Sequence, residues 1–363
     1  MNITLIRRRF TPVGGGELYL QRLIDSLLAE NHTLELISES WQAQQLEGVR
    51  HHFVPTETSR SLRAVSFANG VARLLATLKT DCVFSLERTF KQDIYRAGDG
   101  VHRVWLERQK SFAPIWKRPF CGKGAHHSNL LELERQTLHP ANTKFIIANS
   151  AMVKAEIVSL FAFPAERVRV IPNGVHLNRF ENLDRLTARS RFGLNTSDFV
   201  LLFVGSGWER KGLKYTLQLL KDLQSSRSRF PEPFRSVKLL VVGKGRPPLF
   251  RDPNVIYTGP ISAVESAYAA ANLLAFLPIY EPAANVVTEA LAAKLPVLTC
   301  AMNGAAEWID NGRNGEVVDS PKNREAILEA ALRIMHAAPP TEACDSLSMD
   351  RNVADTLSLI QQV

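Results

Sequence analysis

The sequence predicts an α/β fold with two domains, each built on a doubly wound parallel sheet. Short β-branched runs alternate with longer amphipathic stretches along nearly the whole chain, which is the pattern of strand–helix–strand units. Later runs such as residues 201–204 and 239–242 are apolar on both faces, as a sheet covered by helices on both sides requires. The alternation restarts near Val200 after a turn-rich connector at residues 171–175, and a chain of 363 residues is long enough for two domains.

The individual elements follow from the same pattern. The predicted strands are residues 3–7, 34–38, 52–54, 82–86, 144–148, 169–171, 200–204, 238–242, 255–257, 273–277 and 297–300. The predicted helices include residues 16–30, 150–161, 214–225 and 285–293. Ligands of such sheets bind beyond the carboxyl ends of the strands, so we expect a cleft between the two domains bordered by strand-to-helix loops.

The composition favours a cytoplasmic protein with an anionic partner. The four cysteines lie far apart in the sequence, which fits a reducing compartment. No apolar run reaches the length of a membrane span, and Arg7, Arg8 and Arg9 follow the first apolar stretch, the reverse of the order in a signal peptide. The formal net charge of +8 suggests nucleic acid, anionic lipid or a phosphorylated substrate as partner.

One segment of the first half mixes basic and aromatic side chains. Within residues 110–123 these are Lys110, Phe112, Trp116, Lys117, Arg118, Phe120 and Lys123. Such a mixture suits the headgroup region of an anionic membrane. The alternative is that the aromatic residues are core and the cations a solvated rim. Stacking on single-stranded nucleic acid is a third use, but no nucleic-acid-binding motif accompanies the segment, so we expect no such partner.

Several common site motifs are absent from the sequence. There is no G-x-G-x-x-G, because Arg210 stands where the third glycine after Gly205 belongs, and there is neither a P-loop nor an H-E-x-x-H. No two aspartates stand two residues apart, so the Asp-x-Asp clamp for a metal–diphosphate is missing. These absences argue against a nicotinamide-dependent enzyme, a P-loop enzyme and a zinc peptidase. We also expect no metal site.

Two glycine-rich loops predict anion sites. The first is Gly14-Gly15-Gly16, which follows the first strand and opens the first helix; its backbone can approach a ligand closely and leaves N–H groups free. The second leads from Gly205 through Gly207 to Arg210 and Lys211. We expect these two cations at the start of a helix, where the macrodipole disfavours them, so an anion in front of them would explain their place.

Two glutamates eight residues apart predict a further part of the site. Pro282 suits the first turn of a helix, which places Glu281 at its mouth and Glu289 two turns into it. Eight residues advance about 80° net around a helix, so both carboxylates can border one cleft. N–H groups near Ala284, Asn285 and Val286 would be free for an anion.

Taken together, these motifs resemble the retaining glycosyltransferases of family 4, which have the GT-B fold of two Rossmann-like domains. The match runs through the Gly14–Gly16 loop, Ala148-Asn149-Ser150, Val170-Ile171-Pro172-Asn173-Gly174-Val175, Arg210-Lys211-Gly212, Glu281 and Glu289, Leu295-Pro296-Val297-Leu298, and the stretch from Glu307 to Gly315. The stretch from Tyr95 to Arg103 is similar to its counterpart in the lipopolysaccharide core α-glucosyltransferases. The resemblance implies an acceptor-binding domain over residues 1–172, a nucleotide-sugar-binding domain over 173–345, and a helix within 346–363 that crosses back to the first domain.

The resemblance also implies roles for the residues that match. Arg210 and Lys211 would neutralise the donor diphosphate in place of a metal, while Glu281 would contact the donor sugar and Glu289 the ribose hydroxyls. Asp99 would orient or deprotonate the acceptor hydroxyl. The remaining donor-binding positions would be Gly15, Gly16, Gly207, Ala284, Asn285 and Val286. Ala284 stands where the family usually has glycine, so the sugar pocket is expected to differ in shape, and Lys294 replaces a frequent helix-ending glycine.

The sequence therefore predicts a metal-independent retaining hexosyltransferase without a bound cofactor. Its partners would be a nucleotide sugar, with UDP-glucose expected before UDP-N-acetylglucosamine, GDP-mannose or ADP-heptose, a phosphorylated lipid-linked glycan, and the inner face of the cytoplasmic membrane. Two alternatives stay open: a sugar-nucleotide 2-epimerase of the same fold, and a non-catalytic protein that binds anionic membranes or nucleic acid.

Overall fold

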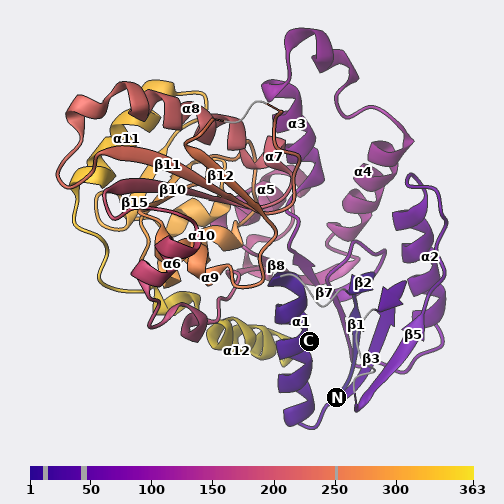
Figure 1. Ribbon diagram of the computed structural model, residues 1–363. Coiled ribbons are helices and arrows are strands. Elements are labelled where there is room, and N and C mark those ends of the chain that lie inside the picture. Colours follow the sequence, from indigo (N-terminus) through magenta and orange to yellow (C-terminus); the bar gives the residue numbers. More distant parts are fainter. Residues whose placement is uncertain (11–14, 42–46, 250–251) are drawn as a thin grey trace. The chain divides into compact units, whose positions relative to one another are not determined.

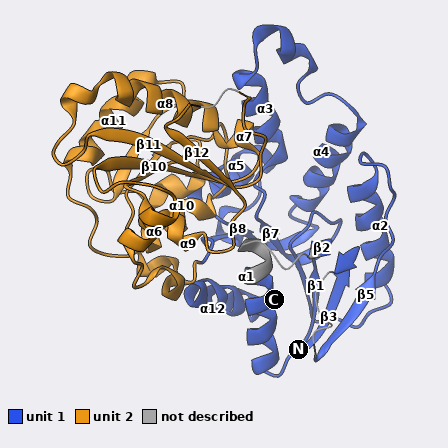
Figure 2. Ribbon diagram, in the orientation of Figure 1, with its two compact units in different colours: residues 1–174, 349–363 blue, residues 175–348 orange. Residues whose placement is uncertain are grey.

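The computed structural model describes residues 1–10, 15–41, 47–249 and 252–363, and it divides the chain into two compact units (Figure 1). The first unit comprises residues Met1–Gly174 and Met349–Val363, and the second comprises Val175–Ser348 (Figure 2). Each unit contains a parallel β-sheet with helices packed against it. The predicted α/β fold class with two doubly wound domains is confirmed.

The first unit is built on a seven-stranded sheet of order β5-β3-β1-β6-β7-β8-β9. These strands are β1 (Asn2–Ile6), β3 (Thr33–Ser38), β5 (Val49–Phe53), β6 (Cys82–Ser85), β7 (Gln92–Ala97), β8 (Thr143–Ala148) and β9 (Val168–Val170). A separate two-stranded sheet follows β1 and β3 and consists of β2 (Arg9–Phe10) and β4 (Ser40–Trp41). Strand β7 was not predicted, because Gln92 and Arg96 make its sequence look polar although both side chains are buried.

Helices cover both faces of this sheet because alternate residues of each strand point to opposite sides. Ile3 and Leu5 of β1 pack with α1 (Gly15–Ala29) and α12 (Met349–Ile360), whereas Ile6 packs with Phe67 and Val71 of α2 (Arg63–Leu75). The other helical segments of this unit are α3 (His102–Phe112), η1 (Ile115–Phe120), α4 (Ala125–Thr137), α5 (Ala151–Phe161) and η2 (Ala165–Arg167). The last helix of the chain thus completes the core of the first unit.

The second unit contains a six-stranded sheet of order β12-β11-β10-β13-β14-β15. Its strands are β10 (Asp198–Val204), β11 (Ser236–Val242), β12 (Val255–Gly259), β13 (Leu273–Ala275), β14 (Val297–Cys300) and β15 (Gly315–Val318). Its α-helices are α6 (Arg185–Arg191), α7 (Trp208–Lys211), α8 (Leu213–Ser225), α9 (Glu265–Ala270), α10 (Asn285–Ala292) and α11 (Arg324–His336). Short 3₁₀ turns are η3 (Leu177–Phe180), η4 (Arg227–Arg229), η5 (Gly304–Trp308) and η6 (Asp345–Leu347). Helices α8 and α11 lie side by side on one face, and α6 and α9 pack together on the other (Figure 1).

One glycine fixes how the loop after β10 meets the segment after β13. Gly212 separates α7 from α8 with a φ of +81°, and a Cβ at this position would lie 1.8 Å from the carbonyl oxygen of Leu277. No other residue type has both the backbone freedom and the room for this contact. The contact brings α7 against the chain that leads to Glu281. Among the described residues, no helix has the length and apolar composition needed to cross a membrane.

Candidate active site

The predicted donor-site residues of the second unit gather where β10 and β13 end. Nη1 of Arg210, in α7, lies 2.7 Å from Oε2 of Glu281, and both side chains are half-buried. The carbonyl oxygen of Arg210 accepts a hydrogen bond of 3.0 Å from the N–H of Ile279. Arg210 is therefore joined to Glu281, 71 positions further along the chain, through its side chain and to Ile279 through its main chain, and these contacts fix the place of its guanidinium.

Lys211 lies beside this ion pair in a desolvated position. Gly205 has a φ of +141°, and a Cβ there would lie 2.8 Å from Nζ of Lys211, while the ring centre of Phe276 is 5.8 Å away. Burial lowers the pKa of the Lys211 ammonium, and the charges of Glu281 and Glu289 act in the opposite direction. A partly dehydrated cation gains more from a bound anion than a solvated one does. A phosphate bound here would therefore interact strongly with Lys211.

The helix position predicted for these two cations is wrong. Arg210 and Lys211 do not open a helix; they form the last turn of the four-residue helix α7. The left-handed backbone of Gly212 ends α7 before α8 begins, so the chain forms two helices where the sequence suggested one. A helix of four residues is about one turn long and has little macrodipole of its own, so α7 neither favours nor disfavours the two cations.

Glu289 is anchored by a tyrosine that the sequence analysis did not identify. The Tyr268 hydroxyl, from α9, donates a hydrogen bond of 2.5 Å to Oε2 of Glu289 in α10. Burial raises the pKa of the Glu289 carboxyl, and Tyr268, Arg179 and Lys211 oppose this rise. Arg179 forms an ion pair of 2.5 Å with Glu265. Nothing in the sequence around Glu289 marks Tyr268 or Arg179 as its neighbours. Tyr268 stands in an apolar run, and Arg179 lies far away along the chain.

The chain between Glu281 and α10 also differs from the prediction. Pro282 is not in a helix, because α10 begins at Asn285 with Ala284 as its N-cap residue. The N–H of Ala284 donates to Oδ1 of the buried Asn303 at 3.2 Å, so this group is not free for a ligand as expected. Val286 is buried in the first turn of the helix. Asn303 was missed because its role depends on contacts from a segment that follows β14.

The glycines predicted to contact the donor lie at the starts of two helices. Gly207 is the N-cap residue of α7 with a φ of +73°, and a Cβ there would meet open space. Gly15 and Gly16 are the first two residues of α1. Gly14 lies outside the described residues. The backbone role expected of the first glycine loop stays a prediction.

Asp99, in the first unit, occupies an exposed turn directly after β7. The turn is held from two sides: Nδ2 of Asn149 donates to the carbonyl oxygen of Gly98 at 3.0 Å, and Nη2 of Arg88 donates to that of Gly100 at 2.9 Å. Asp99 is thus presented at the carboxyl edge of the sheet on a backbone with little freedom.

A buried carboxylate continues this support toward α3. Glu134 accepts from Nη2 of Arg88 at 3.1 Å and from the N–H groups of His102 and Arg103 at 2.6 and 3.1 Å. Burial, with smaller contributions from Arg88 and His127, lowers the pKa of His102 to about 4. Its ring is therefore neutral at pH 7. The described residues contain no group of three or more His, Cys, Asp or Glu side chains arranged to hold a metal.

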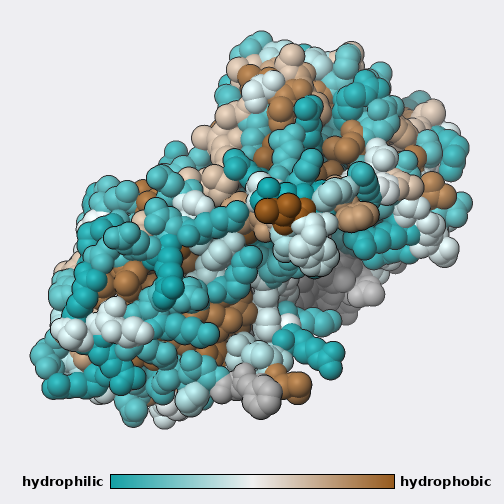
Figure 3. All heavy atoms as spheres, turned by 90° about the horizontal axis from the view of Figure 1, so that it is seen from above, coloured by the Kyte–Doolittle hydropathy of each residue, from teal (hydrophilic) through white to brown (hydrophobic). Residues whose placement is uncertain are grey.

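The basic and aromatic segment at residues 110–123 exposes most of its large apolar side chains. Ile115, Trp116 and Phe120 are 79%, 69% and 75% exposed, whereas Phe112 is half-buried. Nζ of Lys117 lies 4.8 Å from the ring centre of Trp116. Figure 3 shows apolar side chains standing among hydrophilic ones on the surface. The alternative that Trp116 and Phe120 are core residues is wrong.

The second unit also has a cavity of about 1760 Å³ away from these residues. It is lined by residues at the amino ends of the strands, among them Thr196, Phe199, Asn272, Pro296 and Gly315. Substrates of doubly wound sheets bind at the opposite, carboxyl edge. The region around Arg210, Glu281 and Glu289, at the carboxyl edge of the sheet, is therefore the better candidate site in spite of the size of this cavity.

Comparison with known proteins agrees with the fold and the motifs. Residues 13–179 match the family model described as Glycosyltransferase Family 4, and residues 198–337 match the model described as Glycosyl transferases group 1. The lipopolysaccharide glucosyltransferase WaaG of Escherichia coli is 26% identical over 97% of this chain and 93% of its own. The crystal structure of WaaG superposes with a TM-score of 0.76 at 23% identity, covering 99% of this chain and 98% of that one. Anabaena Alr3699/HepE, solved in complex with UDP-glucose, has a TM-score of 0.66 at 16% identity and covers 99% of both chains. The chain belongs to the glycosyltransferases of family 4 and group 1, with the GT-B fold.

Proposed function

We propose that the protein transfers a hexosyl group from a nucleotide sugar, with UDP-glucose as the first candidate, to a lipid-linked glycan such as the lipopolysaccharide core. The names of two similar proteins support this direction, because one is a lipopolysaccharide glucosyltransferase and one was solved with UDP-glucose. The observation that carries the proposal is the cluster at the carboxyl ends of β10 and β13, where Lys211 and Arg210 lie beside Glu281.

In this proposal the cations of the second unit bind the donor diphosphate. Lys211 supplies a desolvated ammonium and Arg210 a guanidinium held by Glu281, and both interactions strengthen as negative charge develops on the leaving phosphate. Preorganised cations of this kind replace the charge of a metal ion, so the reaction proceeds without one. Glu289 accepts hydrogen bonds from the ribose hydroxyls through the oxygen that Tyr268 leaves open.

The transfer proceeds with retention of the anomeric configuration. The acceptor hydroxyl attacks on the face that the diphosphate leaves, and Glu281 contacts the donor sugar while it holds Arg210. Asp99, on its supported turn, orients the acceptor hydroxyl or removes its proton. The first unit therefore handles the acceptor and the second unit the donor.

The acceptor requires the enzyme to work at an anionic membrane surface, the inner face of the cytoplasmic membrane. The exposed Trp116 and Phe120 suit the headgroup region, and Lys117 and Arg118 between them add attraction to anionic lipids. We therefore propose residues 110–123 as the membrane contact of a peripheral enzyme.

A thermal-shift panel of sugar nucleotides tests the proposal. A ligand present at 100 times its Kd stabilises the folded state by about 2.7 kcal/mol, which gives a clear rise in unfolding temperature. We expect UDP-glucose to raise it in the presence of EDTA, and Lys211→Ala to abolish the rise. If no sugar nucleotide in the panel raises the unfolding temperature, the proposed function is wrong. Formation of a free epimerised sugar nucleotide without an acceptor would instead indicate a 2-epimerase.

A further inference from the structure

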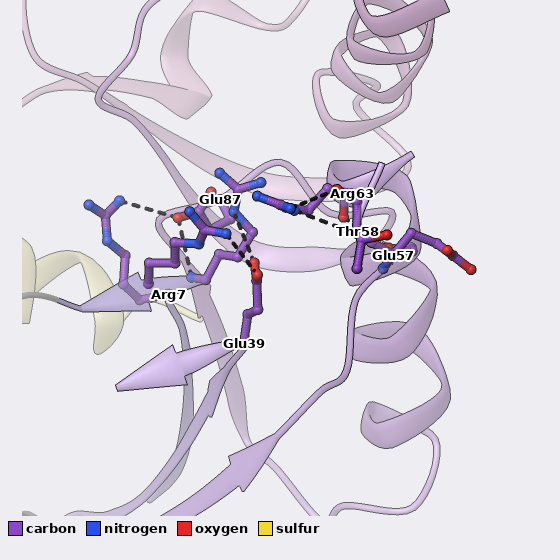
Figure 4. A network of polar contacts seen from close by, with 9 residues as sticks. Arg7, Glu39, Glu57, Thr58, Arg63 and Glu87 are labelled. Carbon is purple, nitrogen blue, oxygen red and sulfur yellow. Dashed lines mark hydrogen bonds and ion pairs between the residues drawn. The ribbon is translucent and has the colours of Figure 1, made fainter. Parts of the chain in front are cut away.

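Three consecutive arginines follow β1, and two glutamates hold them together (Figure 4). Nη1 of Arg7 lies 3.3 Å from Oε1 of Glu87, and the N–H of Arg8 donates to the same oxygen at 3.2 Å. Nη2 of Arg9 lies 2.9 Å from Oε1 of Glu39. Both carboxylates are largely buried, with side chains 20% and 15% exposed. The glutamates thus keep in one place cations that would otherwise repel one another.

A further arginine, Arg63 at the start of α2, is drawn in the same view (Figure 4). Nη2 and Nε of Arg63 donate to the carbonyl oxygens of Thr58 and Glu57 at 2.8 and 3.3 Å. The side chain of Glu57 points away from the arginines (Figure 4). Burial acts to raise the pKa of the Glu39 carboxyl, but Arg9 and Thr56 lower it. We call Arg7, Arg8 and Arg9 the arginine cluster; it sets three guanidinium groups against the two carboxylates of Glu39 and Glu87.

Arg8 is the least satisfied member of the arginine cluster. Its Nε is buried without a hydrogen-bond partner in the described part of the chain, and Oε2 of Glu39, which is also buried without one, lies 3.9 Å away, within ion-pair distance but too far for a hydrogen bond. The side chain is 31% exposed, so the guanidinium is reached from solvent. Buried donors in folded proteins are nearly always paired, and those that are not call for a missing partner. The arginine cluster has more positive than negative charges and a hydrogen-bond donor without an acceptor. A bound anion would supply both the missing charge and the acceptor.

We propose that the arginine cluster binds a phosphate group carried by the acceptor glycan. This inference rests on the proposed function, since it gives the acceptor its anchor in the first unit. The cluster stands beyond the carboxyl ends of β1 and β6, at the same edge of the sheet as Asp99. The guanidinium fork pairs with phosphate through two parallel hydrogen bonds, which gives orientation as well as charge.

The neighbourhood of the cluster supports this role. Asp99 is close enough to Glu87 to raise the pKa of that carboxyl, after the larger effect of burial. A phosphate held by Arg7 and Arg8 would therefore lie near the residue proposed to orient the attacking hydroxyl. A phosphorylated sugar bound in this way would place its neighbouring hydroxyl groups at Asp99.

The test uses the water-soluble phosphorylated oligosaccharide obtained by deacylating lipopolysaccharide, and the same material after phosphatase treatment. Binding to the full-length protein is measured by calorimetry without a donor. Arg8→Gln leaves the Arg7–Glu87 and Arg9–Glu39 ion pairs in place. Arg9→Gln with Glu39→Gln removes a pair and keeps the net charge. The matched control is Arg22→Gln with Asp350→Asn, an exposed pair of 3.1 Å in the same unit.

We expect Arg8→Gln and the Arg9/Glu39 double variant each to weaken binding of the phosphorylated oligosaccharide by about tenfold or more, as loss of a charge-assisted hydrogen bond does. The control should bind as the wild type does. Phosphatase treatment should weaken binding to the wild type and erase the difference between the variants. Equal affinity of the wild type for the two oligosaccharides, or wild-type binding by both cluster variants, would overturn the proposal.

Two further arms distinguish a glycan phosphate site from a lipid headgroup site and from a loss of donor binding. Vesicles of anionic lipid should sediment the variants as they sediment the wild type; selective loss of vesicle binding would assign the cluster to lipid headgroups and overturn the proposal. UDP-glucose should raise the unfolding temperature of the variants and of the wild type equally. If UDP-glucose raises the unfolding temperature of neither the wild type nor the variants, the proposed function is wrong. The arginine cluster would still be a phosphate site if oligosaccharide binding depends on Arg8.

Discussion

Nη1 of Arg210 lies 2.7 Å from Oε2 of Glu281, so a residue from α7 and a residue from the loop before α10 form one unit of the candidate site. Its neighbour Lys211 has no carboxylate within ion-pair distance in the described part of the chain, although Glu281 and Glu289 both act on it electrostatically. Arg210 is therefore held by the protein, and Lys211 is the cation that we propose for the donor phosphate.

Replacing Lys211 by alanine should abolish most of the activity without harming the fold. Loss of one cation aimed at the developing phosphate charge should cost about 2–4 kcal/mol of transition-state stabilisation. The unfolding temperature should not fall, because burial of this ammonium lowers its pKa and so makes its charged form costly in the folded state. The measurement is kcat/KM for the donor together with a melting curve.

The matched control for this variant is Lys214→Ala. Lys214 is an exposed residue of α8, three positions further along the chain, and its ammonium lies over the Tyr215 ring. It should keep wild-type turnover. Turnover of Lys211→Ala within about threefold of the wild type would show that the role assigned to this cation is wrong.

Asp99→Asn should lower turnover while leaving donor affinity unchanged. The amide keeps the shape of the side chain but accepts a proton poorly and loses the charge that orients the acceptor hydroxyl. General-base contributions are typically about 10²–10⁴-fold in rate, so the effect should be plain in kcat. Donor binding by thermal shift should match the wild type. A loss of donor affinity in this variant would contradict the placement of Asp99 at the acceptor.

Much of the fold was predictable because it depends on local sequence. The strands β10 and β11 are apolar on both faces, and their continuous pairing from Asp198–Ser236 to Val204–Val242 is what such runs produce. Strand β7 was not predictable in this way. Its Gln92 is buried against Thr89 and Thr143, and its Arg96 against Asn173 and the Tyr19 ring, and all of these partners except Thr89 come from distant segments.

The sequence suggested that four residues of the second unit lie close together, but not the geometry in which they do so, and their roles stay predictions. Arg210, Lys211, Glu281 and Glu289 come together as their motifs suggested. The helix break at Gly212 depends on Leu277, which is 65 residues further along the chain, and no local pattern contains that contact. The hydrogen bond from Tyr268 to Glu289 likewise joins two different helices. Contacts of this kind follow from packing and not from spacing.

Lys294→Gly should stabilise the second unit. Lys294 has a φ of +56° after the end of α10, a left-handed conformation that costs a non-glycine residue free energy. Glycine removes this strain, but part of the gain is lost because glycine has more backbone freedom in the unfolded chain. The free energy of unfolding should therefore rise by about 0.5–1 kcal/mol. Urea unfolding of the purified protein measures it.

The neighbouring Ala293→Gly is the control with the opposite sign. Ala293 has an ordinary φ of −79°, so glycine there should destabilise the protein by about 0.5–1 kcal/mol. If Lys294→Gly lowers the stability as Ala293→Gly does, the left-handed position carries no strain worth relieving. Neither variant should change turnover.

Vesicle sedimentation tests the membrane contact. The wild type should pellet with anionic vesicles at low salt, dissociate near ~0.5 M NaCl and ignore neutral vesicles, because the attraction of each cation is screened within a Debye length. Replacing Lys110, Lys117, Arg118 and Lys123 by serine should weaken vesicle binding, and Trp116→Ser with Phe120→Ser should do the same at constant charge. Donor binding should stay intact in both.

The control replaces four exposed cations of the same unit that lie outside residues 110–123. Arg22, Arg50, Arg73 and Arg135 are all solvent-exposed, and their replacement removes the same total charge. This variant should pellet more strongly than the quadruple variant of the segment. Equal loss in both would mean that total charge, and not this segment, brings the protein to the membrane.

The most direct test of the account is the anomeric configuration of the product formed without a metal ion. The protein is incubated with UDP-glucose, the phosphorylated oligosaccharide and EDTA, and the coupling constant of the new anomeric proton is read by NMR. The account predicts an α-linked product from the α-linked donor, formed by the wild type and lost in Lys211→Ala. A β-linked product, or complete loss of transfer on addition of EDTA, would contradict it.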